Sequence, residues 1–212
     1  MKNQYLGLCL VSQPIEHALK SYEKFLTQAI AGGVTSVQLR IKDKNPDELY
    51  DVTRQIKTLL DSLDIPLIIN DHVLLAKEVD ASGVHLGQTD MSPFAARQLL
   101  GPEKIIGWSI ETLAELQRAN QISCIDYVAA SAVFQSKTKT DCKTFWGIEG
   151  LQQLVQLSKH PLIAIGGIDA ENAAAVMATG VEGIAVVSAI HDAENPMLAA
   201  KKLRDKVERK ND

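Results

Sequence analysis

Short apolar runs alternate with amphipathic segments along the whole chain, and this alternation limits the folds that the chain can adopt. Most of the runs are continuous rather than alternating, as expected for parallel strands whose outer faces are covered by helices. We expect strands at residues 6–11, 36–39, 67–70, 83–86, 105–109, 127–130, 162–165 and 183–187. Between them, helical spacing predicts helices that include residues 18–31, 46–60, 113–121, 149–157 and 196–207.

Eight strand–helix units in one chain indicate a barrel. The sequence has 212 residues and shows no linker or low-complexity tract that would divide it. We therefore predict a single α/β domain over residues 1–212, a (β/α)8 TIM barrel. The alternative is an open doubly wound sheet, which often carries a glycine fingerprint after its first strand. Here that strand runs into residues 11–14 (VSQP), which contain no glycine.

The composition argues against several classes of partner. The formal net charge is −4, so the chain is not a polybasic nucleic-acid binder. No apolar run approaches the roughly 20 residues of a membrane span, and the first run is too short for a secretory signal. The three cysteines show no pairing or metal-binding pattern, which favours a reducing compartment. We expect a cytoplasmic protein that binds neither nucleic acid nor membranes, and a homodimer is compatible with the sequence.

Charged residues gather where the expected strands end, and those ends form the active-site face of a barrel. Gln38, Arg40 and Lys42 alternate along the second strand and its exit, so they share one side of an extended chain. Their two cations favour a phosphate or diphosphate ligand, although a strand exit in water would also be charged. Asp71 and Asp90 follow the third and fourth strands. Two carboxylates beside phosphate oxygens are typical ligands of Mg²⁺.

The later strands add hydroxyl and glycine groups. Segment 135–141 (QSKTKTD) follows the sixth strand and combines hydroxyls with lysines, which suits an anion site, although a solvated loop is the alternative. Gly166 and Gly167 end the seventh strand, and loops after strands seven and eight of such barrels often bind phosphate.

Two residues of the fourth and fifth strands have less certain roles. Ser109 ends the fifth strand, and the sequence shows no histidine partner for it, so we do not interpret it as a nucleophile. It could instead orient a polar ring. His85 lies between apolar neighbours and is interpreted as a core histidine with satisfied hydrogen bonds rather than as a metal ligand.

Six segments, taken together and in order, resemble the thiamine-phosphate synthase family. They are 37–42 (VQLRIK), 69–71 (IND), 83–90 (GVHLGQTD), 134–139 (FQSKTK), 164–168 (AIGGI) and 186–190 (VVSAI). The resemblance implies a transferase that joins a hydroxymethylpyrimidine diphosphate to a thiazole phosphate, using Mg²⁺ and releasing pyrophosphate. It also implies a dissociative substitution, which needs no general base because the attacking thiazole nitrogen carries no proton.

The resemblance assigns roles to individual positions. Those that match contacts to the pyrimidine diphosphate are Gln38, Arg40, Lys42, Asn70, Ser109 and Lys139. Those that match the Mg²⁺ ligands are Asp71 and Asp90. Those that match contacts to the thiazole phosphate are Ser136, Thr138, Gly167, Val187 and Ser188. Within this set, the candidates for catalysis are Arg40, Lys42, Ser109 and Lys139.

The chain departs from the family pattern at two places. Ile41 stands where a glutamate is usual, and segment 130–136 (ASAVFQS) replaces a more typical Gly-Pro and Pro-Thr. Three alternatives stand beside this interpretation, and the departures bear on the second. One is a related thiazole tautomerase, which would need acid–base groups in place of a diphosphate and metal pocket. Another is a phosphate-binding barrel without turnover. The third is a sugar-phosphate isomerase, which would need a carboxylate base near the phosphate site.

Overall fold

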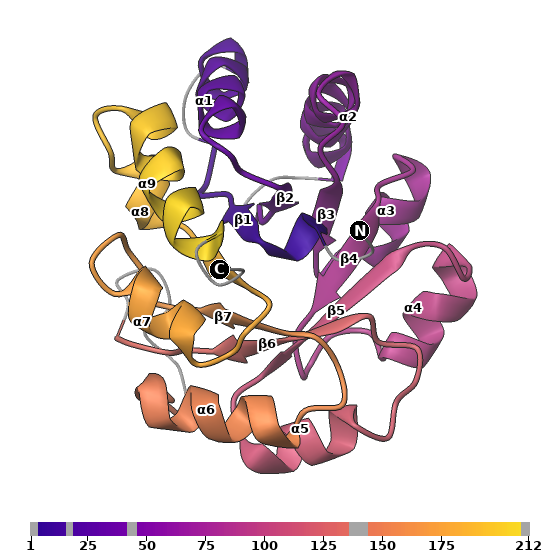
Figure 1. Ribbon diagram of the computed structural model, residues 1–212. Helices are drawn as coiled ribbons and strands as arrows, with labels where there is room; N and C mark the ends of the chain where they lie inside the picture. Colours follow the sequence, from indigo (N-terminus) through magenta and orange to yellow (C-terminus); the bar gives the residue numbers. More distant parts are fainter. Residues whose placement is uncertain (1–3, 16–18, 42–45, 136–143, 209–212) are drawn as a thin grey trace.

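A computed structural model describes residues 4–15, 19–41, 46–135 and 144–208. Eight parallel strands form a closed barrel in which β8 pairs with β1 as well as with β7 (Figure 1). The strands are β1 (Leu8–Val11), β2 (Ser36–Leu39), β3 (Leu67–Asn70), β4 (Gly83–Leu86), β5 (Ile105–Ile110), β6 (Tyr127–Ser131), β7 (Leu162–Ile165) and β8 (Gly183–Val186). The closure confirms the predicted (β/α)8 barrel, and the alternative of an open sheet is wrong.

The helices surround this barrel on the outside (Figure 1). They are α1 (Leu19–Ala31), α2 (Pro46–Ser62), α3 (Val73–Glu78), α4 (Pro93–Leu100), α5 (Leu113–Ala119), α6 (Gly147–Leu157), α7 (Ala173–Ala178), α8 (Ser188–His191) and α9 (Pro196–Glu208). Most predicted bounds differ from these by no more than two residues. The first strand starts later than predicted because Gln4–Leu6 form a 3-10 turn, η1, that is closed by a hydrogen bond from Gly7 N to Gln4 O.

The alternation of side chains along each strand produces two apolar layers. Leu8 and Leu10 of β1 are fully buried and belong to the large core between the barrel and the helices. Cys9 and Val11 alternate with them and belong to a second cluster, with residues of β6, β7 and β8. Because both faces of each strand are buried, the strands appear in the sequence as continuous apolar runs.

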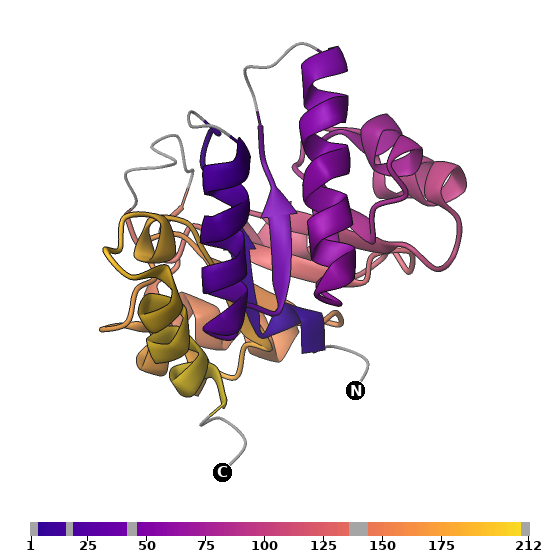
Figure 2. The same cartoon turned by 90° about the horizontal axis from the view of Figure 1, so that it is seen from above.

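The strands all run toward one end of the barrel, which carries the candidate site. In Figure 2, η1 and the last turn of α9 both lie at the opposite end of the barrel. A Cβ atom added at Gly7 would lie 2.6 Å from Arg204 Nη1 and 3.6 Å from Val207 Cγ1, so the start of β1 packs closely on the end of α9.

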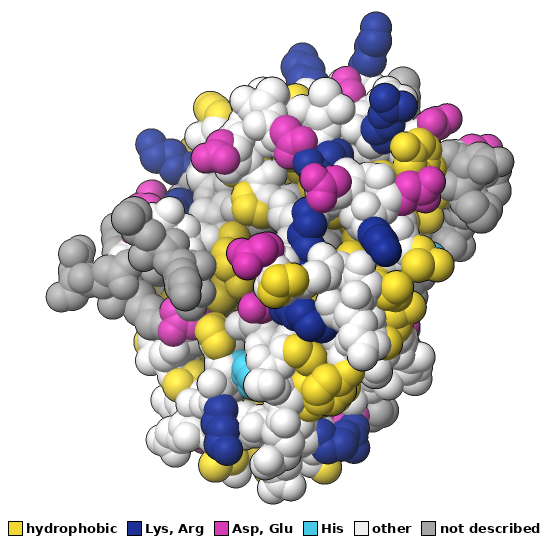
Figure 3. All heavy atoms as spheres, turned by 90° about the vertical axis from the view of Figure 1, so that its right-hand side faces the viewer, with side chains coloured by type: hydrophobic (Ala, Val, Ile, Leu, Met, Phe, Trp, Pro, Cys, Tyr) yellow, Lys and Arg dark blue, Asp and Glu magenta, His cyan; other side chains and the backbone are white. Residues whose placement is uncertain are grey.

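The outer surface shows no field of a single charge in the view of Figure 3. On this face, which includes α3 and α4, basic and acidic side chains are interspersed with apolar ones. Among the described residues, no helix combines the length and the apolar character needed to span a membrane.

Candidate active site

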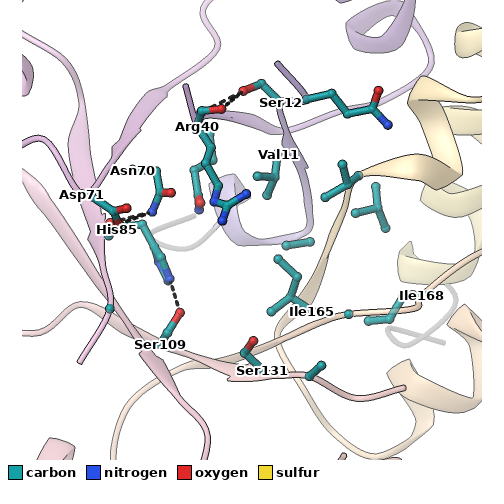
Figure 4. Close-up of a pocket in the computed structure, with 18 of the residues that line it drawn as sticks. Val11, Ser12, Arg40, Asn70, Asp71, His85, Ser109, Ser131, Ile165 and Ile168 are labelled. Carbon is teal, nitrogen blue, oxygen red and sulfur yellow. Dashed lines mark hydrogen bonds between the residues drawn. The ribbon is translucent and has the colours of Figure 1, made fainter. Parts of the chain in front are cut away.

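A cavity of about 680 Å³ opens at the carboxyl ends of the strands (Figure 4). All the described residues that the sequence singled out for ligand or metal binding line it. They are Gln38, Arg40, Asn70, Asp71, Asp90, Ser109, Gly167, Val187 and Ser188. The four remaining candidates, Lys42, Ser136, Thr138 and Lys139, lie outside the described residues.

One wall of the cavity carries an arginine. Arg40 follows β2, and its guanidinium extends toward the centre of the cavity in Figure 4. Its backbone is held by Ser12 at the end of β1. The Ser12 hydroxyl accepts a hydrogen bond from Arg40 N at 2.8 Å and donates one to Arg40 O at 3.2 Å. Ser12 is almost completely buried. It lines the cavity, yet the sequence analysis did not select it.

Two carboxylates lie on the loops after β3 and β4. Asp71 has a left-handed backbone, with φ 66°, which aspartate tolerates better than most residues. Its backbone N–H donates to His85 O at 2.9 Å, and the side-chain Nδ2 of Asn70 donates to its Oδ1 at 2.6 Å. Asp90 Oδ2 accepts a hydrogen bond from Gly87 N at 2.6 Å. Both carboxylates are therefore oriented by neighbouring groups at the cavity wall.

These carboxylates fit one particular kind of metal site. Within the described part of the chain, no group of three or more His, Cys, Asp or Glu side chains is placed to hold a metal ion. The described residues therefore form no cage made only of protein ligands, which is the arrangement of a structural zinc site. Mg²⁺ commonly takes one or two carboxylates and completes its coordination with water and substrate phosphates. Asp71 and Asp90 fit that second arrangement.

Asn70 supplies a buried acceptor. Its Nδ2 donates to Asp71 Oδ1 and, at 3.2 Å, to His85 O. Its Oδ1 has no hydrogen-bond partner, although Asn70 is only 8% exposed. A buried acceptor without a partner costs about 1–3 kcal/mol. A ligand with an N–H donor would remove that cost.

The hydroxyl of Ser109 has a histidine partner, which the sequence analysis did not find. His85 Nε2 lies 2.8 Å from Ser109 Oγ, and His85 Nδ1 lies 2.9 Å from the hydroxyl of Tyr127. His85 is only 6% exposed and both its ring nitrogens have partners, as expected of a histidine with satisfied hydrogen bonds, and it also lines the cavity. Burial raises the pKa of the Tyr127 hydroxyl well above 10.

The opposite wall of the cavity differs in chemistry, because β7 and β8 present backbone and apolar groups. Gly166 and Gly167 have positive φ values of 104° and 65°. A Cβ atom at Gly167 would lie 2.6 Å from Gln135 O and 2.8 Å from Phe134 Cβ. This close approach, and the left-handed backbone, require glycine there. Ile165, Ile168 and Ala185 complete this wall.

The two departures from the family pattern lie in different parts of the structure. Ile41 is buried in the core between barrel and helices and does not line the cavity. Ser131 and Ala132, which replace the usual Gly-Pro, do line it, and the peptide bond between them is cis.

Other cavity residues were missed because nothing local in the sequence marks them. They include Ser12, Gln88 and Glu111. Gln88 donates from Nε2 to Ser109 O at 2.7 Å and accepts from Arg118 at 2.8 Å. A polar residue just after each strand is the signal that could have identified them, although it does not separate such residues from ordinary turns.

The fold and the site together define a class of (β/α)8 barrels, with a polar cavity at the carboxyl ends of the strands that is lined by an arginine, carboxylates and paired glycines. Comparison with known proteins narrows this class. A sequence profile described as thiamine monophosphate synthase matches residues 8–190. The chain belongs to this family, as the six segments indicated.

Individual relatives are similar in sequence to this protein over most or nearly all of its length. The thiamine-phosphate synthase of Chlamydia caviae is 44% identical over 209 residues, which cover 99% of this chain and 98% of that protein. The thiamine-phosphate synthase of Vibrio parahaemolyticus is 48% identical over 185 residues, 87% of this chain and 90% of that one. The thiamine phosphate pyrophosphorylase of Pyrococcus furiosus has a TM-score of 0.86 at 35% identity, with 98% of each chain covered.

Proposed function

We propose that this protein is a thiamine-phosphate synthase. It joins 4-amino-2-methyl-5-(diphosphooxymethyl)pyrimidine to 4-methyl-5-(2-phosphooxyethyl)thiazole and releases thiamine phosphate and pyrophosphate. One observation carries the proposal beyond family membership: every described residue that matches a family contact lines the same cavity. Its two unlike walls suit two unlike substrates.

The charged wall would hold the pyrimidine diphosphate. Arg40 offers a rigid fork of N–H donors to phosphate oxygens, and Gln38 lies beside it at the end of β2. We propose that Lys42 and Lys139 add cations to the same group. The buried Oδ1 of Asn70 is suited to accept a hydrogen bond from the amino group on the pyrimidine ring.

The residues at the other wall would hold the thiazole phosphate. We propose backbone contacts from Gly167, Val187 and Ser188, together with the hydroxyls of Ser136 and Thr138. Apolar Ile165 and Ile168 would lie against the uncharged part of this substrate. The two substrates would then meet across the cavity with their phosphates apart.

The reaction requires charge stabilisation more than proton transfer. The bond from the methylene carbon to the diphosphate oxygen breaks, and its electron pair leaves with pyrophosphate. The thiazole nitrogen then donates its lone pair to that carbon and forms the new C–N bond. Arg40, Lys42 and Lys139 would stabilise the departing negative charge, which is electrostatic catalysis by fixed groups. The cavity wall aligns the two rings and limits access of water to the cation.

Asp71 and Asp90 would hold Mg²⁺, which would neutralise diphosphate charge and act as a Lewis acid. The proposal also includes a cytoplasmic location, because both substrates are charged metabolites. The proposal does not specify whether the protein is a monomer or a homodimer, and light scattering would distinguish the two.

The test is direct. Purified protein is mixed with both substrates, with Mg²⁺ or with excess chelator, and thiamine phosphate and pyrophosphate are measured. We expect both products in equal amounts and only with the metal. An Arg40→Gln variant should lose most activity, whereas Arg54→Gln, on the outer helix α2, should not. A folded protein that binds the substrates without forming product, or that only isomerises a thiazole, would refute the proposal.

A further inference from the structure

Three residues that are adjacent across the sheet form one row inside the barrel. The strand register pairs His85 of β4 with Gly107 of β5, and Gly107 with Tyr127 of β6. Their side-chain positions therefore lie side by side. Ser109 is two residues beyond Gly107 on β5, so it faces the same way, one step nearer to the mouth of the barrel.

The middle position of the row is glycine, and this lets the outer two side chains meet. A Cβ atom at Gly107 would lie 2.1 Å from Tyr127 Cζ and 2.4 Å from its hydroxyl oxygen. The Tyr127 ring thus occupies the space that any other residue at position 107 would fill. Its ring centroid is 5.5 Å from that of His85, and its far side makes an edge contact with Tyr5.

The hydrogen-bond chain Tyr127–His85–Ser109 has a direction. Tyr127 is 2% exposed, and burial raises the pKa of its hydroxyl, so the hydroxyl stays protonated and has one proton to donate. Among the residues that the structure describes, His85 Nδ1 is the group within hydrogen-bonding distance to receive that proton. The neutral imidazole then carries its own proton on Nε2 and donates it to Ser109 Oγ.

We propose that Tyr127 and His85 are positioning residues that make Ser109 a hydrogen-bond donor toward the cavity. With its oxygen lone pair engaged by Nε2–H, the Ser109 hydroxyl proton is directed to a ligand atom. The group recognised there is an acceptor without a hydrogen, such as a nitrogen of an aromatic ring. The identity of that ring as the pyrimidine rests on the proposed function, whereas the direction of the chain does not.

The first experiment measures the tautomer of His85 and needs no turnover. Protein with ¹⁵N-labelled histidine is studied near neutral pH by NMR that correlates ring nitrogens with ring protons. The sequence has five histidines, and a His85→Gln variant, or contacts to the Tyr127 ring, assigns the relevant signals. We expect a protonated Nε2 and an unprotonated Nδ1. A proton on Nδ1, in the neutral ring or in an imidazolium, would overturn the inference.

The second experiment tests whether Tyr127 acts through Ser109. Tyr127→Phe keeps the ring and removes the donor, and it should raise KM for the pyrimidine diphosphate about tenfold, as for one lost hydrogen bond. KM for the thiazole phosphate should stay within about twofold. In a Ser109→Ala background, Tyr127→Phe should change neither value. Tyr5→Phe, which removes the hydroxyl of the partly buried ring in contact with Tyr127, serves as the control.

The outcomes separate the inference from the proposed function. If the tenfold effect of Tyr127→Phe persists without Ser109, then Tyr127 acts on packing alone and the inference fails. If the protein does not make thiamine phosphate, the tautomer measurement still decides the direction of the chain. An active enzyme with a proton on His85 Nδ1 would refute this inference and leave the proposed function intact.

Discussion

The Ser12 hydroxyl holds Arg40 by both its backbone N–H and its backbone C=O, at 2.8 and 3.2 Å. These two residues follow different strands, β1 and β2, so one hydroxyl fixes the chain exit that carries the main described cation of the cavity. The position of the Arg40 guanidinium therefore depends on a residue that bears no charge.

Ser12→Ala should weaken both stability and substrate binding. It leaves the Arg40 N–H without its partner, which costs about 1–3 kcal/mol when buried. KM for the pyrimidine diphosphate should rise, because Arg40 becomes less well oriented. The matched control is Thr58→Ala, which removes an exposed hydroxyl bonded to Arg54 O on α2. Denaturant unfolding and steady-state kinetics of the two variants give the comparison, and equal behaviour would refute the role of Ser12.

Asp71→Asn should abolish most metal-dependent turnover. Asparagine tolerates a positive φ as aspartate does, so the backbone is kept while the charge is lost. If the carboxylate holds Mg²⁺, turnover should fall on the order of a hundredfold, because a bound metal supplies several kcal/mol. Asp64→Asn is the control, since Asp64 also has a positive φ, 55°, but lies before β3 at the other end of the barrel. The measurement is the turnover rate as a function of Mg²⁺ concentration. An unchanged dependence in Asp71→Asn would show that Asp71 does not bind the metal.

Gly167→Ala should affect the thiazole phosphate more than the pyrimidine substrate. The added Cβ would meet Gln135 O and Phe134 Cβ, and must push the loop after β7 away from the exit of β6. Gly101→Ala offers a precise comparison, because Gly101 has φ 86° and open space around the added atom. That variant should show only the backbone cost of about 1–3 kcal/mol, because φ 86° and ψ 176° favour glycine. An effect of Gly167→Ala that exceeds the effect of Gly101→Ala reports on the contacts of the added Cβ. A normal KM for the thiazole phosphate in Gly167→Ala would contradict the proposed role of Gly167.

Protonation of His191 should lower the free energy of unfolding in mild acid. Burial lowers its pKa to about 4, while the unfolded value is near 6.5, and its Nε2 lies 3.2 Å from Val11 O. The neutral ring is favoured in the folded state, so this stability is complete above pH 6.5 and is lost as the pH falls toward 4. The shift corresponds to at most about 3 kcal/mol. His191→Gln keeps a donor without this titration and should flatten the decline in unfolding free energy between pH 6.5 and 4. An equally steep decline in His191→Gln would show that other titrating groups cause it.

The sequence was sufficient for the barrel because each strand is a local apolar run with polar ends. β2, β3, β4 and β7 lie at their predicted bounds for this reason. The grouping of Arg40, Asp71 and Asp90 also follows, since parallel strands in a barrel end on one face.

Contacts that depend on register could not be predicted in the same way. His85 and Ser109 are 24 residues apart, and their pairing requires knowing which residues of β4, β5 and β6 lie opposite one another. Ile41 is a second example, because only its direction relative to the strand shows that it leaves the cavity and joins the outer core.

The division of the cavity into a side-chain wall and a backbone wall has a consequence for how this enzyme can diverge. In the proposed function, side chains after β2 to β5 mainly recognise the pyrimidine substrate. The main chain after β7 and β8, with the hydroxyls after β6, recognises the thiazole substrate. These segments share no strand. Exchanging the β7–β8 loops between homologues should therefore transplant tolerance for altered thiazoles while the preference for pyrimidines is inherited unchanged.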